Sequence, residues 1–263
     1  MPRLISRRPV IGVVEMHGMI GAGIRPSAFY QLLDRVERSH RIGVLVLDID
    51  SPGGGAAASE DLYFKVERLV RKKPVVAFVR GTGASGAYMV ACAATRIVAL
   101  PGAIVGSIGV ISLRPVLAQL LERLGVGVAV NKSSPLKDMG AFYRAATSEE
   151  ETKLQTLVDD LYGQFVERVA RGRHMSADQA RQHATGEVFT GLRGKEIGLV
   201  DQVGDFDDAL DLAASLGKVV RRTVYLRPPR SYRLRLLGRF TSWATEGLLE
   251  EAEPLLGRRL WYM

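Results

Sequence analysis

Short apolar runs alternate with amphipathic stretches along most of the chain. The runs at 10–14, 42–49, 75–79, 96–100 and 126–130 are rich in Val, Ile and Leu and predict β-strands. Helical patterns occupy 26–39, 56–72, 86–94, 113–124, 176–184 and 206–216, and several of them begin or end at Gly or Pro. Strands that alternate with helices favour an α/β fold with parallel strands and crossover helices.

A longer helix is predicted after residue 147. Thr147 followed three residues later by Glu150 has the pattern of a capping box, in which each side chain satisfies a backbone N–H of the other residue. The helical pattern that starts there continues to about Arg171.

The positive charge is concentrated at the carboxyl end. The chain has 36 Lys and Arg against 28 Asp and Glu, but residues 218–263 hold ten of the basic residues and only four Glu. We therefore expect one globular domain over residues 1–217 and a basic tail over 218–263. Because the domain itself is close to neutral, the charge pattern argues against a basic surface that binds the phosphate backbone of nucleic acids. No nucleic-acid partner is expected.

Membrane contact is expected to be peripheral at most. The apolar run at 10–14 is much shorter than a signal sequence or a bilayer-spanning helix, so the chain is expected on the cytoplasmic side. In the tail, Leu236, Leu237, Phe240 and Trp243 recur at helical spacing between arginines. Such a segment suits either a membrane surface or the surface of a neighbouring subunit.

The residue types needed for metal or disulfide chemistry are scarce. Cys92 is the one cysteine, and no group of Cys and His has zinc-ligand spacing. We expect no disulfide, no metal site and no cofactor.

Two glycine-rich loops follow predicted strands and precede predicted helices. The first, Asp48-Ile49-Asp50-Ser51-Pro52-Gly53-Gly54-Gly55, has three glycines that free the backbone to turn its N–H groups toward a ligand oxygen. The second, Gly81-Thr82-Gly83-Ala84-Ser85-Gly86, places Ser85 among small residues on a sharp turn. A serine there can be a nucleophile or simply a helix cap, and the glycine run can equally be a plain turn.

A nucleophilic serine needs a general base, and the four histidines have no context that suggests one. A lysine can serve instead, because apolar surroundings favour its neutral form. Lys137 lies near Leu136, Met139 and Phe142 and is a candidate. Ser107, between Gly106 and Ile108, could hydrogen-bond and orient such an amine.

Together these loops resemble the signal peptide peptidase A family of Ser–Lys serine proteases. The resemblance rests on an ordered set of motifs across about residues 10–215, comprising Asp50-Ser51-Pro52-Gly53-Gly54, Ala84-Ser85-Gly86, Gly106-Ser107-Ile108-Gly109-Val110, Lys137-Asp138, Phe189-Thr190-Gly191 and Gly198-Leu199-Val200-Asp201.

This resemblance implies an α/β fold of the ClpP/crotonase-like type and hydrolysis of peptide bonds in signal peptides or other unfolded segments. It implies Ser85 as nucleophile, Lys137 as general base and Ser107 as the residue that orients the base. Gly54 and Gly86 are the implied oxyanion-hole residues, with Gly53 as an alternative to Gly54. It also implies a ring-like homo-oligomer, expected to be an octamer, in which the base can come from a neighbouring protomer.

Two other functions are compatible with the same loops. A crotonase-type acyl-CoA enzyme would share the fold and the oxyanion loops but would use carboxylates where this chain offers Ser85 and Lys137. A non-catalytic oligomeric scaffold would share the assembly without the chemistry.

Overall fold

The structure, a computed structural model, describes residues 8–227. Its centre is a mixed sheet with the strand order β6-β5-β3-β2-β1-β8, and β4 pairs with both β3 and β7. All described strand pairs are parallel except β5 with β6. The strands are β1 (Val10–His17), β2 (Ile42–Ser51), β3 (Val75–Ala84), β4 (Arg96–Ala99), β5 (Ile104–Gly106), β6 (Val188–Thr190), β7 (Gln202–Val203) and β8 (Thr223–Leu226).

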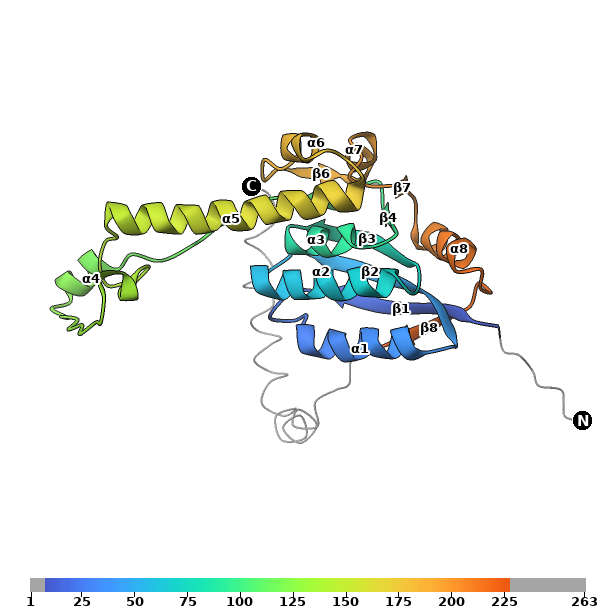
Figure 1. Ribbon diagram of the computed structural model, residues 1–263, viewed down its shortest axis with the longest axis horizontal. Helices are drawn as coiled ribbons and strands as arrows, with labels where there is room; N and C mark the ends of the chain where they lie inside the picture. Colours follow the sequence, from blue (N-terminus) through green and yellow to red (C-terminus); the bar gives the residue numbers. More distant parts are fainter. Residues whose placement is uncertain (1–7, 228–263) are drawn as a thin grey trace, which may run out of the picture. The chain divides into compact units, whose positions relative to one another are not determined.

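Helices cover both faces of the sheet (Figure 1). The helices are α1 (Pro26–Arg38), α2 (Ala56–Val70), α3 (Gly86–Cys92), α4 (Ala118–Arg123), α5 (Ser148–Arg173), α6 (Ala177–Gln182), α7 (Gly191–Glu196) and α8 (Phe206–Gly217), with one 3-10 turn, η1 (Pro135–Asp138). Alternate residues of β1 and β2 point to opposite faces, as the period of a strand requires. One set packs with α1, α2, α3 and α5 in the larger core, and the other packs against α8.

The predicted alternation of strands and helices is confirmed for most of the chain. The runs at 10–14, 42–49, 75–79 and 96–100 are strands of one sheet, and the predicted helices fall on α1, α2, α3, α4, α6 and α8. The capping box of Thr147 and Glu150 is present at the start of α5, which ends at Arg173.

The strand predicted at 126–130 is wrong. These residues form neither strand nor helix, and Val126, Val128 and Val130 are each more than 40% exposed. They belong to residues 111–147, here called the arm, which also contains α4 and η1 and projects beyond the sheet with the first turns of α5 (Figure 1). The alternation of valines fits a strand, but no described strand lies beside it to pair with.

The globular unit continues past the predicted boundary at 217. It extends to Arg227, because β8 pairs with β1 in the sheet and Arg221 forms ion pairs with Asp207 and Asp211 of α8. The rise in positive charge at 218 thus precedes the end of the fold. The amphipathic pattern at 233–243 lies outside the described residues.

Within residues 8–227, no helix combines the length and apolar character that crossing a bilayer requires.

The position of β8 predicts how truncation affects stability. A chain that ends at Gly217 loses the hydrogen bonds between β1 and β8, so we expect its free energy of unfolding to fall by at least about 2 kcal/mol. A chain that ends at Arg227 keeps these hydrogen bonds and should have a higher urea midpoint than the chain that ends at Gly217. Equal midpoints for the two truncated chains would contradict this role of β8.

Candidate active site

Ser85 lies on a sharp turn between β3 and α3. Its backbone has φ +52° and ψ −125°, a region that residues with a side chain rarely adopt and that stores strain. The turn is held from both sides, because the Ser85 N–H donates to the carbonyl of Gly106 (2.8 Å) and the Ser85 carbonyl accepts from the N–H of Met89 (3.0 Å). The turn therefore presents the half-buried Ser85 side chain at the carboxyl end of the sheet.

Glycines let the first predicted loop and helix α2 approach the Ser85 turn closely. A Cβ at Gly53 would lie 2.7 Å from the nitrogen of Gly86, and a Cβ at Gly86 would lie 2.1 Å from Oγ of Ser59. Gly53 also has φ +97°. Only residues without a side chain fit these two contacts. The glycines therefore allow the first loop and α2 to pack against the Ser85 turn.

The backbone N–H groups around Ser85 differ in their partners. The N–H of Gly53 donates to Oγ of the buried Ser51 (3.1 Å). Within residues 8–227, the N–H groups of Gly54 and Gly86 donate no hydrogen bond. These two amides are thus unpaired within the described residues, whereas that of Gly53 is occupied.

Asp50 has a structural role in the first motif. Its Oδ1 accepts a hydrogen bond from the N–H of Thr82 (2.9 Å), and this bond joins the ends of β2 and β3 where their pairing shifts register. The motif Asp50-Ser51 thus fixes both loops through its side chains.

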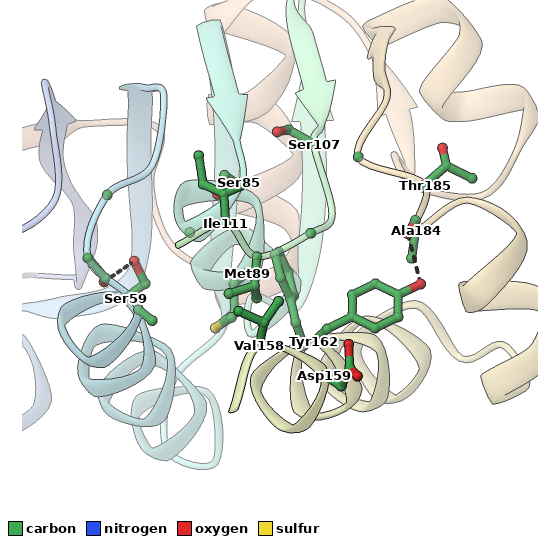
Figure 2. Close-up of a pocket in the computed structure, with 18 of the residues that line it drawn as sticks. Ser59, Ser85, Met89, Ser107, Ile111, Val158, Asp159, Tyr162, Ala184 and Thr185 are labelled. Atoms are coloured by element: carbon green, nitrogen blue, oxygen red, sulfur yellow. Dashed lines mark hydrogen bonds between the residues drawn. The ribbon is translucent and has the colours of Figure 1, made fainter. Parts of the chain in front are cut away.

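A cavity of about 620 Å³ opens beside Ser85 (Figure 2). Ser85, Gly86 and Gly54 lie in its wall, and so does Ser107. Ser107, like Ser85, has a positive φ (+51°), and its N–H donates to the carbonyl of Glu187. Four of the five predicted site residues therefore line one cavity.

The opposite wall of the cavity comes from α5. Val158, Tyr162 and Phe165 face the cavity at helical spacing, and the Tyr162 hydroxyl donates to the carbonyl of Ala184 (2.8 Å). Figure 2 shows Tyr162 across from the Ser85 turn. Ser59 and Met89 add to the lining. None of these was predicted as a site residue, although the apolar spacing on α5 is a signal that this face is covered.

Lys137 lies apart from the cavity within this chain. It is exposed on η1 in the arm and is not among the residues that line the cavity. Its neighbour Asp138 accepts hydrogen bonds from Lys132, Tyr143 and Arg144, and Arg144 also binds Glu150 at the start of α5. This network fastens the turn that carries Lys137 to α5.

Hydrogen bonds in this network lower the pKa values of two carboxyl groups. Arg144, with the N–H of Thr147, lowers the pKa of Glu150 to about 2. Arg144 and Lys132 hold the pKa of Asp138 well below its ordinary value.

Among the described residues, the lining of the cavity includes neither a cysteine nor a lysine, and its one acidic residue is Asp159. The four histidines lie elsewhere. The one cysteine, Cys92, is buried, and burial raises the pKa of its thiol to about 12, which keeps it protonated. No described group of His, Cys, Asp and Glu residues could hold a metal ion.

The comparisons with known proteins identify the family. Residues 67–220 match the family model described as peptidase family S49. The chain belongs to peptidase family S49. This assignment confirms the resemblance drawn from the ordered motifs, since signal peptide peptidases of the A type are among the similar proteins.

Two curated relatives and one solved structure show how far the likeness extends. "Putative protease slr0021" of Synechocystis sp. is 41% identical over 82% of this chain and 77% of its own length. "Putative signal peptide peptidase SppA" of Enterococcus faecium is 31% identical over 84% of this chain and 63% of its own length. A mutant of the 1510-N membrane-bound stomatin-specific protease superposes with a TM-score of 0.55 at 17% identity, over 84% of this chain and 99% of that one, which shows a shared fold.

The packing at Gly54 predicts a large effect of a small substitution. In Gly54→Ala, the new Cβ would lie 2.0 Å from the carbonyl oxygen of Ile20, at a φ of +155°. We expect a loss of about 2 kcal/mol or more in the free energy of unfolding. The control is Gly55→Ala, whose Cβ would meet only the Ala58 side chain, at 3.9 Å. Urea denaturation measures both variants, and equal midpoints would contradict the close contact.

The pKa of Glu150 predicts a pH dependence of stability. Because folding lowers this pKa from an ordinary 4.5 to about 2, the ionised group stabilises the fold fully above about pH 4.5, and the stabilisation is lost as the pH falls toward 2. Glu150→Gln should therefore lower the urea midpoint at pH 7 and have much less effect near pH 2. The exposed Glu149→Gln is the control, and a Glu150→Gln effect that does not change with pH would contradict the assignment.

Proposed function

We propose that this protein is a serine endopeptidase that hydrolyses signal peptides or other unfolded peptides through a dyad of Ser85 and Lys137. The observation that carries the proposal is the strained Ser85 turn, which faces a large cavity beside two free backbone amides. Membership of family S49 supports peptide hydrolysis over the acyl-CoA and scaffold alternatives.

The chemistry proceeds by acyl transfer. The neutral amine of Lys137 removes the proton of the Ser85 hydroxyl as Oγ attacks the peptide carbonyl, and the N–H groups of Gly54 and Gly86 stabilise the resulting oxyanion. The protonated amine then gives its proton to the leaving nitrogen, the C–N bond breaks and an acyl-enzyme remains. A water molecule, deprotonated by the same amine, then attacks the acyl carbon. The bond from that carbon to Oγ breaks, the amine returns the proton to Oγ, and the second product leaves. Ser107 orients the amine by a hydrogen bond.

The base comes from a neighbouring protomer in this proposal. Lys137 lies outside the cavity of its own chain, on an arm that exposes Ile111 (80%), Leu113 (86%) and Leu124 (66%). Soluble proteins rarely leave so much apolar surface uncovered, and such surfaces are commonly subunit interfaces. A homo-oligomeric ring, an octamer by family resemblance, would cover these side chains and bring Lys137 of one protomer toward Ser85 of the next.

The substrate class follows from the lining and from the assembly. The cavity walls are largely apolar, with Met89, Val158 and Phe165, and so suit the apolar side chains of signal peptides. A closed ring would admit unfolded segments and exclude folded proteins. Peripheral membrane contact through residues 218–263 would bring the protein to such substrates.

Substitution of either dyad residue tests the mechanism. Ser85→Ala and Lys137→Ala should each reduce kcat for a synthetic signal peptide and for an unfolded protein by a factor of at least about 1,000 while the oligomer persists in light scattering. Lys153→Ala, which removes an exposed lysine of α5 outside this network and outside the cavity lining, is the control and should keep most of the activity. A Lys137→Ala variant as active as wild type would refute the dyad.

Mixing the two inactive variants tests where the base comes from. If they are dissociated and reassembled together, a Ser85→Ala protomer can supply Lys137 to the intact Ser85 of a neighbouring Lys137→Ala protomer. We expect recovery of about a quarter of wild-type activity at equal amounts, because half of the sites keep Ser85 and half of those receive Lys137. No recovery from fully mixed oligomers would place the base in the same chain.

The protonation state of the base predicts the pH profile. Since only the neutral amine accepts a proton, kcat/KM for the signal peptide should rise with pH and reach its maximum at neutral or alkaline pH. Full activity well below neutrality would exclude lysine as the base.

A further inference from the structure

One charged residue lines the cavity beside Ser85, and the proposed chemistry does not use it. Of the described residues in the cavity wall, only Asp159 carries a charge, while the others are apolar, small or neutral polar. In an otherwise uncharged cavity, a carboxylate is the group that can distinguish a cationic ligand from a neutral one.

Asp159 belongs to the α5 wall, across from the nucleophile. It follows Val158 and precedes Tyr162 by three residues, so its side chain lies beside the apolar strip of that wall. Figure 2 shows the carboxylate next to the ring of Tyr162, with the Ser85 turn on the other side of the cavity. Met89 and Val158 line the same cavity and add apolar surface to it.

The carboxylate of Asp159 has a hydrogen-bond partner on the same helix but no cationic partner in the described part of the chain. Asp159 is exposed where it borders the cavity, and Nε2 of the exposed Gln155 donates to its Oδ1 (2.7 Å). In the described part of the chain, Asp159 takes part in no ion pair, whereas the buried Glu150 on the same helix is paired with Arg144. The negative charge of Asp159 is therefore available to a bound molecule.

An apolar cavity surface with a carboxylate beside it suits one kind of peptide side chain. Lysine and arginine have three or four methylene groups that pack on apolar surface, with a cationic head that remains at a polar or charged end. The methylene groups of such a side chain can contact the apolar lining while its cationic head meets the carboxylate of Asp159.

We propose that Asp159 is a specificity-determining residue that favours substrates with a lysine or arginine side chain near the cleaved bond. This inference rests on the proposed peptidase function and adds a charge preference to it. Asp159 contacts the substrate side chain and takes no part in proton transfer.

The experiment compares peptides that differ only in charge. Quenched fluorogenic peptides of one apolar sequence carry arginine or its neutral isostere citrulline at each of the four positions before and after the cleaved bond. The ratio of kcat/KM for arginine to that for citrulline reports the charge preference at each position, independent of shape. Wild type, Asp159→Asn and Asp159→Lys are compared, with the exposed Asp160→Asn as the matched control, since Asp160 does not line the cavity.

The proposal predicts a ratio of about five at one position for wild type, which is the scale of a partly solvated ion pair, and a decrease of this ratio as salt rises. Asp159→Asn should bring it to about one, Asp159→Lys should bring it below one, and Asp160→Asn should keep the wild-type value.

Two results would overturn the inference, and they are distinguishable. If wild type cleaves arginine and citrulline peptides equally at every position, or if Asp159→Asn keeps the ratio, the charge preference is wrong while the peptidase function stands. If wild type cleaves neither these peptides nor an unfolded protein, the proposed function fails and the preference fails with it.

Discussion

The backbone of Ser85 is the constraint on which the rest of the site depends. A serine at φ +52° persists only if its neighbours hold it, and they do so through the carbonyl of Gly106, the first turn of α3 and the close contact of Gly53 with Gly86. These contacts join β2, β3 and β5 at their carboxyl ends. In the described part of the chain the N–H groups of Gly54 and Gly86 donate no hydrogen bond, so the arrangement that holds the Ser85 turn also has two unpaired backbone amides.

In the proposed mechanism, two separate parts of the chain provide the two halves of the catalytic site. The globular unit provides Ser85, Ser107 and the cavity, and the arm provides Lys137 on a turn fastened by Asp138 and Arg144. The arm exposes apolar residues and the described cavity lining has no lysine, and a second copy of the chain could complete both features. Such a design would make activity depend on assembly, which is a safeguard for a peptidase.

Much of this site could be predicted from sequence because it lies in short local motifs. Small residues around Ser85 and the run Gly53-Gly54-Gly55 carry their own backbone signal, and the strands that end at these loops are strongly apolar. The wall from α5 could not be located, since contacts between residues over 70 positions apart depend on tertiary packing. The valines at 126–130 illustrate the opposite error: their alternation satisfies the local rule for a strand, yet a strand also requires a partner, and none of the described strands pairs with them.

The most direct test of the account is covalent labelling of Ser85 by a fluorophosphonate probe, with the adduct located by mass spectrometry in separated oligomer and monomer fractions. A serine becomes reactive toward such a probe when a base activates it. The account predicts that Ser85 is labelled in the oligomer at least about ten times faster than in the monomer, since only the oligomer supplies Lys137 from a neighbouring protomer. Equal labelling of Ser85 in both fractions, or labelling of a different serine, would contradict it.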